Sequence, residues 1–155
     1  MNWNTFALWR ALHVLSVVFW IGGVAFVTTV LLPSLRQQGD DYPTFDKLER
    51  RFGLQAKVTT QVALISGLGM LWVTNGWSRL LDTWWLWAML IAWALFSTML
   101  FILEPIVLHK VLHERSKKDP AGTLKLLQRM HYLLLAVSLV ALIGGVLGAH
   151  GGAWL

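Results

Sequence analysis

Four blocks of apolar residues constrain this chain more than any other feature of its sequence. They cover residues 8–32, 57–77, 84–108 and 130–149. About twenty helical residues, rising about 1.5 Å each, are enough to cross a hydrocarbon core of roughly 30 Å. With 56% hydrophobic and 14% charged residues in 155 positions, the chain has more apolar surface than a soluble domain of this size can hide. The sequence therefore predicts an all-α integral membrane four-helix bundle, with residues 1–155 forming a single transmembrane domain.

The distribution of lysine and arginine predicts the topology of this bundle. Only Arg10 and Arg79 lie outside the first and third connections and their edges. The other eleven are Arg36, Lys47, Arg50, Arg51, Lys57, Lys110, Arg115, Lys117, Lys118, Lys125 and Arg129. Because cytoplasmic loops are enriched in basic residues, we expect both termini on the outer side of a bacterial-type inner membrane. This placement also explains the net charge of +5, so we expect membrane lipid as a partner and no nucleic acid.

Small and polar residues share one face in each predicted span, because residues seven apart on a helix point nearly the same way. The four stripes are His13, Ser16, Trp20 and Gly23; Ala56, Thr60, Ala63, Gly67, Met70 and Thr74; Ala94, Ser97 and Glu104; and His131, Ser138, Ala141, Gly145 and Gly148. Close helix packing explains the glycines and serines. It does not explain His13 or Glu104, since ionisable groups inside a span are costly and usually face a cavity, a partner or a cofactor.

Histidine is the candidate ligand for any cofactor, since the chain has no cysteine. His13 and His150 fall near the same outer level, whereas His131 and His109 fall near the opposite side. Two imidazoles from different helices hold a haem iron in some membrane bundles. We therefore expect haem b, with His13 and His131 as the first candidate ligands of the metal and His150 and His109 as their candidate partners. Alternatives stay open: His150 is also typical of a frayed helix end, and His131 of a helix start.

Charged residues gather at the depth predicted for His131. Arg51 and Lys57 would neutralise haem propionates there. Glu104 precedes Pro105, where a helix is expected to bend. Because an unpaired carboxylate at that depth is costly, we expect Glu104 to pair with Lys57, Arg51 or His131.

The opening span also resembles a known family. Its segment is Ala11-Leu12-His13-Val14-Leu15-Ser16-Val17-Val18-Phe19-Trp20-Ile21-Gly22-Gly23, followed by Leu32-Pro33 and a basic loop. It resembles the first helix of the CopD-like copper-resistance membrane proteins, in which a histidine, a tryptophan seven residues later and a glycine pair recur. Arg51-Phe52-Gly53, running into Ser66-Gly67, resembles their next helix. The same half of the chain is similar to the HemJ-type protoporphyrinogen oxidases, four-span proteins that bind haem b. The resemblance implies that His13 is a haem or metal ligand.

Together these features predict a haem b-binding membrane protein with a redox or electron-transfer role, which would be an oxidoreductase acting with a quinone, a porphyrinogen or a small oxidant. A copper-transport or copper-resistance protein is the first alternative, because thioethers such as those of Met70, Met89 and Met99 suit copper(I). His109 and His113, four residues apart on one helix face, are a further candidate metal pair. A cofactor-free partner subunit, including one copy of a homo-oligomer, is the second alternative.

Overall fold

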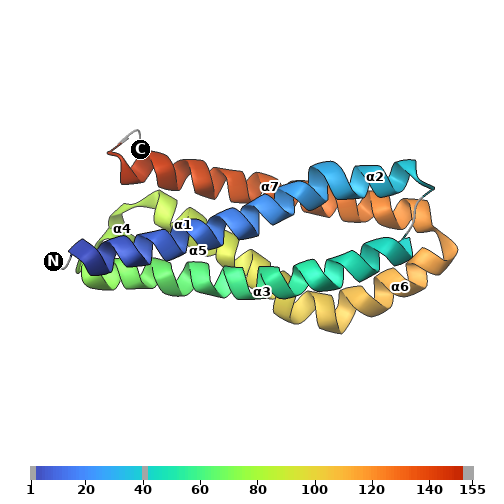
Figure 1. Cartoon of the computed structure of the whole chain (residues 1–155), viewed down its shortest axis with the longest axis horizontal. Helices are drawn as coiled ribbons and strands as arrows, with labels where there is room; N and C mark the ends of the chain where they lie inside the picture. The colour runs from blue at the N-terminus through green and yellow to red at the C-terminus, as the bar shows by residue number, and fades with distance from the viewer. Residues whose placement is uncertain (1–2, 40–41, 152–155) are drawn as a thin grey trace.

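Long antiparallel helices make up the chain (Figure 1). The structure, a computed structural model, describes residues 3–39 and 42–151, apart from the side chains of 106–109. The elements in order are α1 (Trp3–Phe26), η1 (Val27–Leu31), α2 (Leu32–Gln37), α3 (Tyr42–Val73), α4 (Arg79–Asp82), α5 (Trp84–Thr98), η2 (Met99–Leu108), α6 (His109–Lys118) and α7 (Pro120–Ala149). The described residues form no strand, and they include four helices long and apolar enough to cross a membrane. The expected all-α membrane bundle is therefore confirmed.

Two of the helices extend well beyond the predicted spans, towards the basic connections. We expected the second span from residue 57, but α3 begins at Tyr42 and continues unbroken into it. Its 32 residues measure about 48 Å, more than a hydrocarbon core of roughly 30 Å requires. Similarly, α7 begins at Pro120 and not near residue 130. Hydropathy detects only the apolar part of each helix, which is why the predicted spans begin later than the helices that contain them.

Each of the two π-helical segments, η1 and η2, lies beside a proline. Pro33 follows η1 by two residues, and Pro105 lies within η2. A proline inside a helix lacks an amide hydrogen, and its ring collides with the carbonyl four residues earlier. A wider turn relieves this collision, and such turns are frequent at functional sites. The irregularity that we expected at Pro105 therefore takes the form of a π-helical stretch.

Helix pairing divides the bundle into two halves. α1 packs mainly on α3, and α5 mainly on α7 (Figure 1). One core of buried side chains joins the halves at the level of the apolar spans; its members are Trp20, Ile21, Val24, Ala63, Phe96 and Leu134. A second core lies nearer the basic connections; its members are Val27, Leu32, Leu35, Tyr42, Phe45, Leu112, Leu124 and Leu127. Phe52 packs against both cores, so it marks the boundary between them.

The predicted stripes include several of the buried small residues. Ser16, Thr60, Ser138 and others from the first, second and fourth stripes are buried. The third stripe was wrong at Ala94, which is exposed; the buried residues of α5 are Ala92 and Phe96. This span is apolar around its whole circumference, so its few small residues did not mark the packed face.

Candidate functional site

His13 on α1 is held by the backbone of α3. Its Nδ1 lies 2.8 Å from the carbonyl oxygen of Ala63 and 3.2 Å from the hydroxyl oxygen of Ser66. Because a carbonyl oxygen only accepts, Nδ1 carries the hydrogen and donates it. The Nε2 atom of this neutral tautomer is then an available base or metal ligand. Gly67 makes room for the ring, since a Cβ atom there would lie 3.4 Å from Cε1 of His13.

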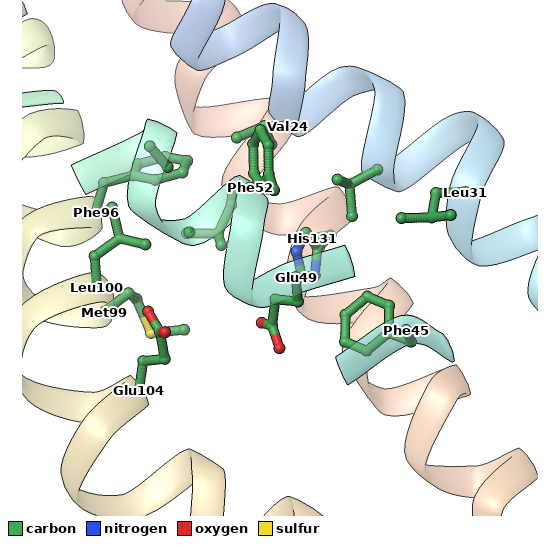
Figure 2. A pocket seen from close by; sticks show the side chains of 14 residues that line it. Val24, Leu31, Phe45, Glu49, Phe52, Phe96, Met99, Leu100, Glu104 and His131 are labelled. Carbon is green, nitrogen blue, oxygen red and sulfur yellow. The ribbon is translucent and has the colours of Figure 1, made fainter. Parts of the chain in front are cut away.

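His131 on α7 lies in a different environment. Its Nδ1 donates to the carbonyl oxygen of Leu127 on the same helix, at 2.9 Å. Its ring stands edge-on to Phe45, with the ring centroids 6.4 Å apart. The side chain lines a cavity of about 70 Å³ together with Glu49 and Glu104 (Figure 2). The structure therefore places His131 between the two cores, beside two carboxylates.

The cavity beside His131 is too small for a haem. Sites for cofactors and drug-sized ligands measure about 300–1,000 Å³, whereas a water molecule in the liquid occupies about 30 Å³. A volume of about 70 Å³ corresponds to a few water molecules at most. A macrocycle does not fit there, so we do not assign His131 as an iron ligand.

The structure also keeps His13 and His131 apart. His13 contacts α3 at Ala63 and Ser66, whereas the ring of His131 stands beside Phe45, near the start of the same helix. Phe45 lies 18 residues before Ala63, which is about 27 Å along the helix. The two imidazoles therefore cannot hold one iron in this arrangement.

The other predicted ligands are not brought to His13 either. His150 is exposed, and its Nδ1 donates to Val146 on its own helix at 2.8 Å. The side chain of His109 lies outside the described residues, so its predicted pairing stays a prediction. Within the described part of the chain, no group of three or more His, Asp and Glu residues could hold a metal ion.

The pairing predicted for Glu104 is confirmed. The ammonium nitrogen of Lys57 lies 3.3 Å from Oε1 of Glu104, and both side chains are partly buried. Gly53 lies beside this pair: a Cβ atom there would be 3.6 Å from Oε1. Arg51, the other cation expected at this depth, is exposed. Lys57 is therefore already engaged by a carboxylate of the chain itself.

Sequence reasoning missed Glu49. Its carboxylate enters the same cavity as that of Glu104, from the opposite helix (Figure 2). The signal was present, because Glu49 lies four residues after Phe45 and three before Phe52, on the face that packs into the bundle. Because the second span was predicted to begin only at residue 57, the packed face of the preceding residues was not recognised as part of the same helix, α3.

Comparisons with family models, with curated proteins and with solved structures return no match for this chain.

Proposed function

We propose that this chain is a haem b-binding, multi-pass membrane protein with a redox or electron-transfer role, and that His13 supplies an axial nitrogen. The observation that carries this proposal is the hydrogen bond from Nδ1 of His13 to the carbonyl oxygen of Ala63. Histidines that bind metals commonly donate their other ring nitrogen to a carbonyl or carboxylate, which fixes the tautomer and raises the basicity of the ligand atom. The resemblance of the first span to CopD-like and HemJ-type proteins favours the same residue.

The residues around His13 fit this cofactor in their chemistry. Nε2 of the neutral imidazole forms no hydrogen bond with a described residue, the ring is half-buried, and Gly67 presents no side chain to it. Bound haem would supply one-electron chemistry at a potential tuned by its axial ligand. The proposal uses one histidine of this chain, since neither His131 nor His150 approaches His13.

Arg10 is the cation that would neutralise a haem propionate, in place of Arg51 and Lys57, which were predicted for this role. It lies three residues before His13 on α1 and is exposed. Residues three apart are neighbours on a helix surface, so its guanidinium can neutralise a propionate of a group bound at His13. Lys57 is paired with Glu104 instead.

The proposal includes the location and partners of the protein. The basic connections would face the cytoplasm of a bacterial-type cell, which puts His13 in the outer half of the inner membrane. The electron partner there would be a quinone, a porphyrinogen or a small oxidant that reaches the site from the membrane or the outer space. The chain's own contribution would be to hold His13 in one tautomer and to shield it with apolar side chains.

The experiment compares the absorption spectra of purified wild-type protein, His13→Ala and His113→Ala. His113 is exposed on α6, so it is a matched control. We expect a Soret band in the wild type and in His113→Ala, and its loss in His13→Ala. Added imidazole should restore part of the band in His13→Gly. A wild-type protein without haem, or a His13→Ala protein with full haem content, would contradict the proposal; colourless protein with stoichiometric copper would favour copper handling.

A further inference from the structure

The cavity between the two cores contains more acidic than basic groups. Glu49 of α3 and Glu104 of η2 both reach it (Figure 2). Glu104 is paired with Lys57 at 3.3 Å. Glu49 forms no hydrogen bond or salt bridge with any residue that the structure describes, and its carboxylate shares the cavity with that of Glu104, so the two negative charges repel each other.

The remaining surroundings of Glu49 offset its charge only in part, because the two cations that attract it, Lys57 and Arg50, form their salt bridges with Glu104 and Asp46. α1, η1 and α5 contribute only apolar side chains to the cavity wall; these are Val24, Val27, Leu31 and Phe96. α7 contributes His131, whose Nδ1 is already used by Leu127 and whose Nε2 has no partner among the described residues. On α3, Asp46 lies one turn before Glu49 and Arg50 directly follows it, and these two residues pair with each other at 3.0 Å. One negative charge is therefore left over in a largely apolar space.

The size of the cavity restricts what can balance this charge. About 70 Å³ has room for a few water molecules but not for an organic cation or a metal with its hydration shell. The described residues also lack a set of three ligands that could hold a metal ion. A proton needs no additional volume, and sharing one proton is the usual result when two carboxylates face each other away from bulk water. Ionisable side chains in membrane bundles commonly serve as proton-binding groups.

We propose that this cavity is a proton-binding site, in which Glu49 and Glu104 hold one proton between them while Lys57 balances the second carboxylate. The proton comes from water on the side of the basic connections and is bound to a carboxylate oxygen. Water in the cavity bridges the carboxylates and donates to Nε2 of His131. This function is separate from haem binding, because Glu49 lies 14 residues before Ala63 on α3, which is about 21 Å along the helix.

Infrared spectroscopy tests the proposal directly, because a protonated carboxyl group has its own C=O stretching band, which moves in D₂O. We would record spectra of the full-length protein in lipid nanodiscs near neutral pH. The wild type should show such a band, Glu49→Gln should lose it, and Glu104→Gln should lose or shift it. Lys57→Gln should increase its area about twofold, because the second carboxylate then also needs a proton.

Glu114→Gln is the matched control. Glu114 is exposed on α6, and its hydrogen bond from Lys117 at 2.8 Å lowers its pKa, so it is ionised at neutral pH and contributes no such band. Its replacement should leave the spectrum unchanged.

A wild-type protein without the band, or a band that survives in both Glu49→Gln and Glu104→Gln, would overturn the proposal. So would a band that appears only when choline replaces sodium and potassium, because an alkali cation would then be the occupant. None of these readouts requires haem, so their failure is distinguishable from failure of the His13 proposal.

Discussion

A single glycine determines how closely His13 approaches α3. Gly67 lies against the imidazole, and a Cβ atom there would still be 3.4 Å from Cε1. Alanine is therefore at the limit of what the site accepts, and a larger side chain must displace the ring. Displacement would break the hydrogen bond to Ala63, which fixes the tautomer on which ligation depends.

We therefore predict that Gly67→Leu reduces haem affinity at least about tenfold, the scale found when partners of a metal-binding histidine are lost. The measurement is the ratio of Soret absorbance to protein across a haem titration. Gly22→Leu is the control, because no atom lies within 4 Å of a Cβ atom at Gly22. Equal haem affinity of the two variants would show that the ring is not held in this position when haem binds.

The pair between Lys57 and Glu104 leads to a second prediction at the residue scale. Both side chains are less than one-third exposed, so removing one partner leaves a charge in a poorly solvated place. Lys57→Met should lower the free energy of unfolding by about 1–3 kcal/mol, and the double variant Lys57→Met, Glu104→Gln should recover most of it. Titration with a denaturing detergent measures both.

The exposed pair of Lys117 and Glu114 provides the control for this cycle. Its side chains are 58% and 68% exposed, and water screens such pairs strongly. Lys117→Met should therefore leave the unfolding midpoint almost unchanged. A double variant no more stable than Lys57→Met alone would show that Lys57 acts through its packing and not through its charge.

At the scale of helices, the sequence predicted which segments are apolar enough to span a membrane but not how far they continue. The apolar blocks identified all four helices that could span a membrane. The pairing of Glu104 was predicted because burying a carboxylate without a partner is costly. The start of α3 and the position of Glu49 were missed. Both depend on a second core that lies nearer the basic connections, where the residues are too polar for hydropathy to detect.

The sequence predicted which face of its helix carries His13, but not which residues His13 contacts. Helical periodicity placed His13 on the packed face with Ser16 and Trp20, and both of those residues are buried. Periodicity does not say which helix lies opposite, so it could not show that His13 meets Ala63 and not His150. Pairing between helices depends on how all four pack together, and no local pattern in the sequence contains that information.

The start of α7 provides a prediction at the element scale. Asp119 is its N-cap: its carboxylate accepts the amide hydrogen of Gly122 at 2.8 Å, and Pro120 follows in the first turn. Asp119→Ala should lower the free energy of unfolding by about 1 kcal/mol and accelerate hydrogen exchange in the first turn of α7. Asp119→Asn can still cap the helix, so it should behave like the wild type. Equal destabilisation by both variants would mean that the charge matters and the cap does not.

For the whole molecule, the arrangement separates two polar levels within an apolar bundle. His13 contacts α3 near one end of the bundle, and Glu49, Glu104 and Lys57 lie nearer the other. Thr60 lies between these levels on α3, and its hydroxyl is buried without a hydrogen-bond partner among the described residues. Because buried polar groups usually have a partner, a water molecule is expected at Thr60. The proposed proton site at Glu49, the water at Thr60 and the proposed electron-transfer site at His13 would follow one another along α3.

The sidedness of both levels depends on the topology, which is the last prediction. The first residues of α1 and the last of α7 lie at the same end of the bundle, away from α6 (Figure 1). Eleven of the 13 basic residues lie in or beside the connections at the other end, which should face the cytoplasm. An alkaline phosphatase fused after Leu155 should therefore be active, and a green fluorescent protein fused there should be dark.

Fusions placed after Gln38, in the first connection, are the internal control, and they should give the opposite pair of results. If phosphatase is inactive after Leu155 and active after Gln38, the bundle is inserted the other way round. His13 would then face the cytoplasmic half of the membrane, and the cavity beside Glu49 would take its proton from the outer side. Neither proposed site would change in structure, but the direction in which electrons and protons reach them would be reversed.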